Sequence, residues 1–362
     1  MARKKGDALR RGWTTGACAT AAAKAAYAAL LSGRFPDPVT ITLPKGERPS
    51  FALAREELGE GFARAGIVKD AGDDPDVTHG ALVVATVRQG PAGSGVAFRA
   101  GEGVGTVTKL GLPLPPGEPA INPKPREMMR EAIAEVAREY RGRGDVVIEI
   151  AIPGGEALAQ KTWNPRLGIT GGLSILGTTG VVVPYSCSAW IHSIQRGIDV
   201  ARAAGLVHVA GSTGSTSEAA VKALYALPET ALLDMGDFAG GLLKYLRRHP
   251  LPRLTIAGGF AKISKLAEGH LDLHSGRSQV GHVWLAERLA ELGASPELVL
   301  SARSANSALE TLEHARAAGL AIGDRVAARA RETAMAVLEG APVKVDVVIF
   351  DRAGELIGRS GD

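Results

Sequence analysis

Cysteine and aromatic residues are scarce in this chain. Among its 362 residues only two are cysteines, and 4% are aromatic. Cys18 and Cys187 cannot supply a cysteine-rich zinc site and give no sign of a disulfide framework. A reduced, cytoplasmic setting is therefore the simplest expectation. Because aromatic side chains are few, alanine, valine, leucine and isoleucine must fill the cores of a chain that is 45% hydrophobic.

Long apolar runs and a strong charge excess are also missing. No apolar stretch reaches the length of a membrane span, and the basic segment 1–13 has no apolar region behind it that would indicate a signal peptide. The formal net charge of +4 is a mild excess and not the dense basic stripe of a nucleic-acid-binding protein. We therefore expect no membrane and no nucleic-acid partner, and an acidic small molecule would suit the charge. The sequence does not fix the oligomeric state, so a homo-oligomer stays open.

The chain is long enough for two domains, and its first half has the pattern of an α+β domain. An alanine-rich helix is expected from Thr14 to Leu31, with Thr14 or Thr15 as its cap and Gly33 after its end. A second helix is expected over 121–140, with Pro125 near its start. Short runs rich in valine and isoleucine predict strands at 39–44, 50–56, 62–70, 81–89, 96–105 and 145–155. These elements predict an N-terminal α+β domain with a mixed or antiparallel sheet over residues 1–172.

The second half alternates strands and helices, which is typical of a parallel α/β sheet. Strands are expected at 181–184, 206–210, 231–235 and 253–259, each followed by a helix, at about 186–204, 217–227, 238–248 and 262–268. Further helices are expected at 280–292, 304–318 and 323–339, and a last strand at 343–350. This pattern predicts a Rossmann-like, doubly wound C-terminal domain over residues 173–362. The glycine-rich connector 164–180 would carry the boundary between the two domains.

The stretch LVHVAGSTGSTSEAA (206–220) joins an apolar strand to a helix through a loop of glycine, serine and threonine. It is not a P-loop, and the spacing Gly211 to Gly214 leaves the dinucleotide fingerprint incomplete. Asp234 ends the next predicted strand, where an acidic residue is placed to accept hydrogen bonds from ribose hydroxyls. A glycine loop and a ribose acid without a pyrophosphate fingerprint favour an adenosyl ligand that has no phosphates, of which S-adenosylmethionine is the common one. The alternative is a tight turn with no ligand, because glycine-rich loops are common in such sheets.

Four long blocks of the sequence are GWTTGACATAAAKAA (12–26), AGEGVGTVTKLGLPLPPGEPAINPKPREMM (100–129), IPGGEALAQKTWNPRLGITGGLSILGTTG (152–180) and HLDLHSGRSQV (270–280). They resemble the CbiD family, the cobalt-precorrin-5B C1-methyltransferases of cobalamin biosynthesis. The resemblance runs from about residue 10 to the last predicted strand. It implies a methyltransferase with two domains, S-adenosylmethionine as methyl donor, and a ring-contracted cobalt tetrapyrrole as acceptor. Gly281 and Val183 depart from the family pattern, which often has an acidic residue at these positions.

Residues for the methyl donor follow from the glycine loop and from the segments that match the family. The family's loop corresponds to Gly211–Gly214, a later segment to Gly236–Gly240, and a Gly-x-x-x-Lys turn to Gly258 and Lys262. The expected donor-binding residues are Gly211, Ser212, Thr213, Gly214, Ser215, Asp234, Asp237 and Gly258.

Residues for the acceptor follow from its chemistry, because a tetrapyrrole carries several carboxylates that arginine, lysine and helix N-termini would receive. Lys109 and Arg277 lie in glycine-containing loops, where binding residues concentrate. Thr14 and Thr15 open the first helix, and Thr178, Thr179 and Tyr185 flank what we expect to be the first strand of the parallel sheet. The family resemblance adds Ser275, so the expected acceptor-binding residues are Thr14, Thr15, Lys109, Thr178, Thr179, Tyr185, Ser275 and Arg277.

Methyl transfer from a sulfonium needs no metal and no covalent intermediate, because the donor is already activated and the main task is to align two ligands. His274 is the candidate catalytic residue, as an acceptor for a proton lost from the substrate. His270 and His274 are four residues apart, but the glycines that flank them disfavour a regular helix and no third ligand completes a zinc set, so we expect no metal site. Two other readings stay open: a nicotinamide-dependent reductase acting on a tetrapyrrole, and a tetrapyrrole carrier without catalytic activity.

Overall fold

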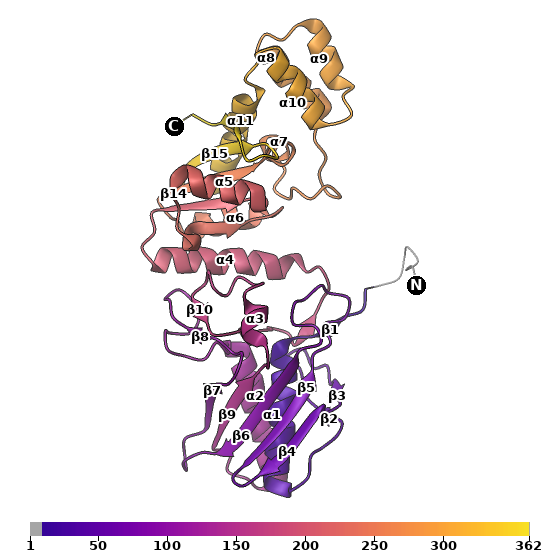
Figure 1. Ribbon diagram of the computed structural model, residues 1–362, viewed down its shortest axis with the longest axis vertical. Coiled ribbons are helices and arrows are strands. Elements are labelled where there is room, and N and C mark those ends of the chain that lie inside the picture. Colours follow the sequence, from indigo (N-terminus) through magenta and orange to yellow (C-terminus); the bar gives the residue numbers. More distant parts are fainter. Residues whose placement is uncertain (1–8, 362) are drawn as a thin grey trace. The chain divides into compact units, whose positions relative to one another are not determined.

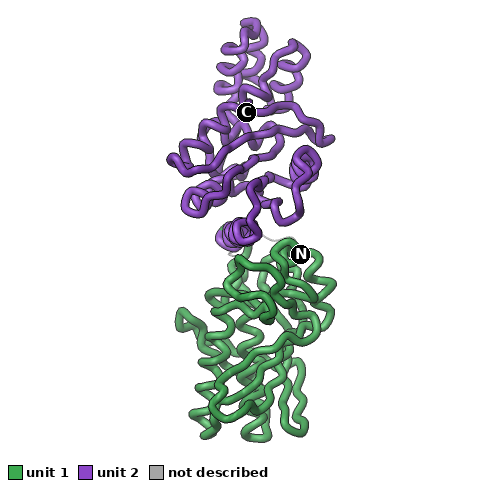
Figure 2. Tube along the Cα trace, turned by 90° about the vertical axis from the view of Figure 1, so that its left-hand side faces the viewer, with its two compact units in different colours: residues 1–187 green, residues 188–362 purple. Residues whose placement is uncertain are grey.

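The structure of this chain is a computed structural model that describes residues 9–361. It consists of two compact units, Met1–Cys187 and Ser188–Asp362 (Figure 2). The sequence-based division, between residues 172 and 173, lies earlier in the chain. No helix among residues 9–361 is both long enough and apolar enough to cross a membrane.

Unit 1 is built on a mixed five-stranded sheet with the order β4-β5-β6-β9-β7. All neighbouring strands run antiparallel except β7 and β9, which are parallel. Figure 1 shows helices α1 and α2 on one face of this sheet. The bounds are β4 Arg55–Gly59, β5 Phe62–Val68, β6 Leu82–Gln89, β7 Val96–Ala100, β9 Val146–Ala151, α1 Thr15–Ser32 and α2 Pro123–Tyr140.

Helix α1 begins and ends as its sequence predicts. The Thr14 side chain accepts a hydrogen bond from the Ala17 N–H, and Gly33 closes the helix in the left-handed conformation, at φ 75°. Its run of alanines is buried, which lets the sheet and α2 approach closely. The two helices begin at the same end, because a Cβ at Gly16 would lie 2.8 Å from Pro125 Cγ near the start of α2. At the opposite ends of the two helices, the Tyr27 hydroxyl accepts the Gly144 N–H at 3.0 Å, so α1 and α2 run parallel.

Short strands complete unit 1, and one of them corrects a prediction. Residues 181–184 were expected to open the parallel sheet of the second half. Instead β11 (Val181–Val182) pairs antiparallel with β1 (Gly12–Trp13), so this segment belongs to unit 1. Its short apolar run pairs with a strand 170 positions earlier in the chain. A local sequence pattern cannot reveal such a distant partner. The other short elements are β2 Val39–Thr40 with β3 Ser50–Phe51, β8 Thr106–Val107 with β10 Ile169–Thr170, and α3 Gly155–Ala159.

Unit 2 holds a second five-stranded sheet with the order β13-β12-β14-β15-β16. The first four strands are parallel, as predicted, and β16 is antiparallel to β15. Strand β16 and helix α9 were not predicted. The strands are β12 His208–Ser212, β13 Leu232–Asp234, β14 Arg253–Gly259, β15 Lys344–Phe350 and β16 Leu356–Arg359, and η1 (Glu229–Ala231) is a short 3₁₀ turn. The helices are α4 Cys187–Ala203, α5 Ser215–Tyr225, α6 Ala239–Arg248, α7 Phe260–Ala267, α8 His282–Glu291, α9 Pro296–Arg303, α10 Ala308–Ala317 and α11 Ile322–Leu338.

Helices α5 and α6 lie on opposite faces of this sheet. A Cβ at Gly211 would meet Leu242 of α6 at 2.4 Å, whereas the ring of His208, three positions earlier in β12, lies against Tyr225 of α5. In the sheet, β13 lies on one side of β12 and β14 lies on the other side. The strand order therefore reverses between β12 and β14, the arrangement that opens a ligand crevice at the carboxyl ends of parallel strands.

Candidate functional site

Three glycine-containing loops meet at the carboxyl edge of the sheet in unit 2. They follow β12 (residues 212–215), β13 (234–238) and β14 (258–260). Backbone hydrogen bonds join them, because the N–H groups of Met235 and Gly236 both donate to Ser212 O, at 2.9 and 3.0 Å, and the Thr213 N–H donates to Ala257 O at 2.9 Å. The structure thus brings together all the residues predicted from the glycine loop and its neighbours.

Two glycines in this edge have different reasons to be there. A Cβ at Gly258 would lie 2.8 Å from both Cγ2 and Oγ1 of Thr213, so the close approach of two loops requires glycine. A Cβ at Gly214 would meet nothing within 4 Å, and its φ of 167° is extended backbone that any residue adopts. Neither packing nor backbone conformation therefore requires a glycine at position 214. The missing side chain leaves open space at the start of α5.

Ser212 ends β12 with its side chain buried and unused. The residue is 0% exposed, and its Oγ has no hydrogen-bond partner within the described part of the chain. A buried hydroxyl without a partner is costly, so each such group in a folded protein calls for an explanation. It lies at the end of β12, beside the crevice between β12 and β14.

Lys262, in the first turn of α7, ties two of these loops together. Its Nζ donates to Thr213 O at 2.9 Å and lies 3.0 Å from Asp237 Oδ1. The sequence matched Lys262 to a family turn but gave it no role. Its role comes from the contact with Asp237, which lies 25 positions earlier in the chain. The sequence indicated this role only by the placement of a lysine at the start of a helix that follows a strand.

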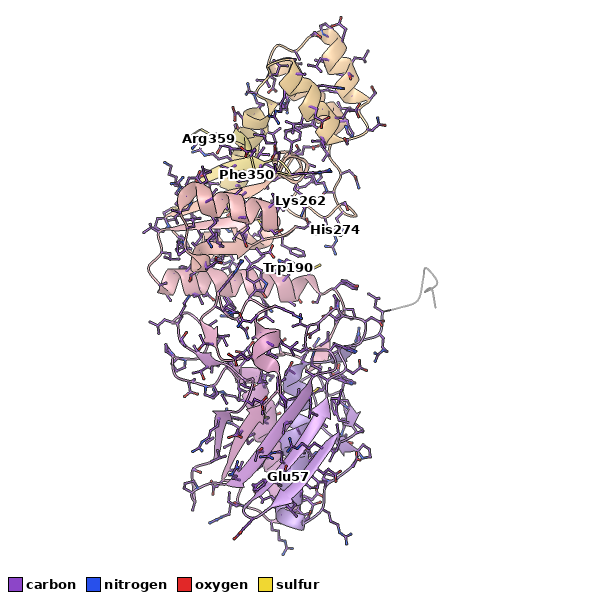
Figure 3. All side chains as sticks on the ribbon, viewed as in Figure 1. Glu57, Trp190, Lys262, His274, Phe350 and Arg359 are labelled. Atoms are coloured by element: carbon purple, nitrogen blue, oxygen red, sulfur yellow. The ribbon has the colours of Figure 1, made fainter. Side chains whose placement is uncertain are left out.

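The loop that carries His274 is fastened to the turn after β13. The Leu273 N–H donates to Asp237 O and the Gly240 N–H donates to Leu271 O, both at 2.9 Å. The Nζ of the buried Lys265 also donates to Leu273 O, at 2.9 Å. These bonds bring the predicted residues His274, Ser275 and Arg277 to the same edge of unit 2 as the glycine loop, and Figure 3 shows His274 and Lys262 on one side of the unit.

His274 and Arg277 already have partners within their loop. Arg277 forms an ion pair with Asp272 at 2.8 Å. His274 Nδ1 accepts the Gly276 N–H at 3.1 Å, which places the proton of the neutral ring on Nε2. In this tautomer Nε2 donates a hydrogen bond and does not accept a proton, which differs from the proton-acceptor role expected from the sequence. His270 and His274 lie on a loop, and residues 9–361 hold no group of three side chains suited to a metal ion.

In unit 1 the structure brings Thr14 and Thr15 together with segment 176–180. The Gly16 N–H donates to Leu176 O and the Thr14 N–H to Gly180 O, both at 3.0 Å. Gly177 lies directly against Thr14, since a Cβ there would come 2.3 Å from Thr14 Oγ1. Thr178 and Thr179 therefore lie beside the start of α1, although the strand edge on which they were predicted belongs to unit 1 and not to the parallel sheet.

Tyr185 and Lys109 lie elsewhere in unit 1. Tyr185 is 67% exposed, and its backbone N–H donates to Asp74 Oδ1 at 2.8 Å. Lys109 extends over Gly168, and its Nζ lies 3.5 Å from Arg166 O.

An acidic group lies beside the start of α1. Asp70 accepts hydrogen bonds from the Arg10 guanidinium, which, with the Gly72 N–H, lowers its pKa to about 2. Its carboxylate is therefore ionised at neutral pH and neutralises the arginine. The backbone of the same residue accepts the Trp13 N–H at 2.7 Å.

Two family models match most of the chain: CbiD over residues 2–184, and the CbiD C-terminal domain over residues 272–361. A relative from Paramagnetospirillum magneticum, named cobalt-precorrin-5B C(1)-methyltransferase, is 65% identical over 352 residues, which cover 97% of this chain and 98% of the relative. This chain belongs to the CbiD family. The resemblance seen in the sequence blocks is thereby confirmed.

Other CbiD relatives give the same result. One from Bradyrhizobium sp. is 65% identical over 351 residues, covering 97% of this chain and 93% of the relative, and one from Brucella anthropi is 63% identical over 351 residues, covering 97% and 95%; both carry the same name. The crystal structure of the cobalamin biosynthesis protein cbiD from Archaeoglobus fulgidus is 29% identical, with a TM-score of 0.40, over 70% of this chain and 77% of that one.

Proposed function

We propose that this CbiD-family chain is a methyltransferase of cobalamin biosynthesis that methylates C1 of cobalt-precorrin-5B, with S-adenosylmethionine as the methyl donor. The observation that carries the proposal is the 65% identity, along 97% of the chain, to relatives named for this reaction.

We assign the donor to the carboxyl edge of the sheet in unit 2, which we infer to be a Rossmann-like fold. The fit rests on the buried Ser212 hydroxyl, which lacks a partner in the described residues, and on the open space at Gly214. S-adenosylmethionine supplies a methyl group on a positively charged sulfur. Asp234 ends β13, where a carboxylate accepts hydrogen bonds from ribose hydroxyls. The backbone N–H groups at the start of α5 suit the amino-acid carboxylate of the donor.

The remaining donor residues shape this edge. Gly211 and Gly258 allow helices and loops to approach closely, and Lys262 fixes the loop of Thr213 against that of Asp237. Ser215 begins α5 and lies beside Gly214. These contacts are made within the protein itself and fix the loops relative to one another.

Each unit, taken by itself, carries residues that suit the carboxylates of the acceptor. In unit 1, α1 and α2 begin side by side, so two helix N-termini favour negative charge near Thr14, Thr15, Thr178 and Thr179. Tyr185 and Lys109 are the further unit 1 residues of this assignment. In unit 2, Ser275 and Arg277 suit carboxylates of the acceptor, and His274 offers its Nε2–H as a hydrogen-bond donor. The protein's main contribution to the rate is alignment of acceptor and donor.

Calorimetric titration of the full chain with S-adenosylhomocysteine, with NADPH in parallel, tests the donor assignment. Saturable binding of S-adenosylhomocysteine alone is expected. Incubation with cobalt-precorrin-5B and S-adenosylmethionine should then raise the mass of the tetrapyrrole by one methyl group. Binding of NADPH alone, or an unchanged tetrapyrrole mass with both substrates present, would contradict the proposal.

A further inference from the structure

A tryptophan on the edge of unit 2 is more exposed than its place in the helix requires. Trp190 lies in the first turn of α4 and is followed at helical spacing by Ile194 and Ile198, which are fully buried. The buried stripe of the helix thus begins with an indole that remains 43% exposed. An indole combines a large apolar face with a polar N–H, so an exposed indole offers its face to a ligand while the N–H bonds to the protein.

The indole is fixed at the end of β13. Its Nε1 donates to Asp234 O at 3.0 Å. The ring also lies against Gly236, where a Cβ would come 3.3 Å from Trp190 Cζ2 and where φ is +54°, so glycine leaves room for the ring. Phe238 borders it, with ring centroids 6.3 Å apart and planes inclined at 50°. A hydrogen bond and two packing contacts therefore set the orientation of the exposed ring.

We propose that Trp190 stacks on the purine of the adenosyl donor. This inference rests on the proposed function, in which Asp234 binds the ribose. Within one nucleoside the base is joined directly to the ribose, so a ribose held by the Asp234 carboxylate brings its base within reach of an indole bonded to the carbonyl of the same residue. Every purine offers a flat π-face to such a ring. Figure 3 shows Trp190 on the same side of unit 2 as Lys262 and His274.

The glycine loop and Trp190 divide the recognition of the donor between them. The loop after β12 offers backbone N–H groups to the charged end of the donor, whereas Trp190 offers an apolar face to its uncharged base. Trp190 thus contributes to the affinity for the base of the donor, since stacking does not distinguish one base from another.

Three variants of the full chain test this role by calorimetry and by tryptophan fluorescence with S-adenosylhomocysteine. Trp190→Leu should bind about 5- to 150-fold more weakly, the range that corresponds to loss of one base–aromatic stack. Trp190→Phe should keep most of the affinity, because a phenyl ring still stacks, but should lose most of the fluorescence quenching that the ligand causes. Trp284→Phe, in α8, removes a tryptophan that packs with Arg288 and should change neither affinity nor quenching.

The outcomes separate this inference from the proposed function. If the wild-type chain binds S-adenosylhomocysteine but Trp190→Leu binds equally well, or if quenching persists in Trp190→Phe, Trp190 does not stack on the purine and the donor assignment stands. If the wild-type chain does not bind the ligand, both fall. Circular dichroism establishes folding, and should Trp190→Leu not fold, the quenching of Trp190→Phe decides, because a purely structural role would not change it.

Discussion

The ammonium group of Lys262 lies 3.0 Å from the Asp237 carboxylate and joins the helix after β14 to the loop after β13. The same group donates to Thr213 O, so one side chain of α7 joins the loops after β12 and β13. Lys262→Met removes these bonds and keeps most of the apolar stem. We expect it to weaken binding of S-adenosylhomocysteine by about 1–3 kcal/mol, the range for hydrogen bonds to charged groups. Calorimetry measures the change.

Lys244→Met is the matched control for this variant. Lys244 is an exposed lysine on α6, so the same substitution there should leave affinity unchanged. Equal affinity of Lys262→Met and Lys244→Met would show that the loops hold their positions without Lys262.

Ser212→Ala separates the stability of the ligand-free chain from its affinity for the ligand. Removal of a buried hydroxyl that has no partner in the described residues should stabilise the ligand-free protein by about 1 kcal/mol. The same change should weaken S-adenosylhomocysteine binding by about 0.5–1.5 kcal/mol if the ligand bonds to that hydroxyl. Urea unfolding and calorimetry measure the two effects.

Ser264→Ala provides the contrast. Ser264 is equally buried, but its Oγ donates to Phe260 O at 2.8 Å. We expect this variant to lose about 1 kcal/mol of stability and to keep its affinity. If Ser212→Ala behaves in the same way, its hydroxyl serves the fold and not the ligand.

Two glycines of one loop should respond differently to alanine. Gly211→Ala places a methyl group 2.4 Å from Leu242 Cδ2 and should destabilise the fold by about 1–3 kcal/mol. Gly214→Ala meets no atom within 4 Å, so the fold should tolerate it. If the donor occupies that space, affinity for S-adenosylhomocysteine should fall about tenfold, or about 1.4 kcal/mol. Unchanged affinity of Gly214→Ala, measured by calorimetry, would remove Gly214 from the contact surface.

Local signals in the sequence predicted some of these features well. The cap at Thr14, the glycine that closes α1 at Gly33 and the strand that ends at Asp234 depend on neighbours a few positions away, and the structure confirms them. The strand at 181–184 was misplaced because two valines fit either a parallel sheet or a short antiparallel pair with Gly12–Trp13. Its choice of partner is a long-range property that the pattern does not carry.

The proposed site was predictable to a similar degree. Glycines, an acidic residue at a strand end and a basic loop are typical of a site that binds a nucleotide-like ligand. Each of these features is visible in the sequence alone. Trp190 was not predicted as a site residue because its spacing fits the buried stripe of α4. Only the structure shows that its ring is exposed and that it donates a hydrogen bond to Asp234 O. The bridging role of Lys262 likewise needed the distance between α7 and the loop after β13.

A buried polar network at the amino end of the sheet in unit 2 should make its stability depend on pH. His208 Nε2 donates to Thr255 Oγ1 at 2.7 Å, because the threonine hydroxyl donates in turn to Asp346 Oδ2 at 2.9 Å. Arg253 and Tyr225 also donate to Asp346, at 3.0 and 2.8 Å. Burial, followed by the charge of Arg253, lowers the pKa of His208 from its ordinary value of 6.5.

The sign of the effect follows from proton uptake. The unfolded chain binds a proton on His208 near pH 6.5, whereas the folded chain resists it, so stability falls as the pH drops below 6.5. Burial would raise the pKa of Asp346, but hydrogen bonds from Arg253, Tyr225 and Thr255 outweigh it and lower the pKa below 3.8. The stability that ionised Asp346 contributes is therefore lost only at a pH below 3.8.

His208→Gln should remove the loss of stability between pH 7 and pH 5, because glutamine still donates to Thr255 but takes up no proton. Urea unfolding of unit 2 at the two pH values measures the effect, and His274→Gln, on the exposed loop, should leave the wild-type loss in place. An identical loss in wild type and His208→Gln would mean that another group carries the acid sensitivity. Because the network lies at the opposite edge of the sheet from the glycine loop, His208→Gln should also leave the affinity for S-adenosylhomocysteine at pH 7 unchanged, which separates a role in stability from a role in binding.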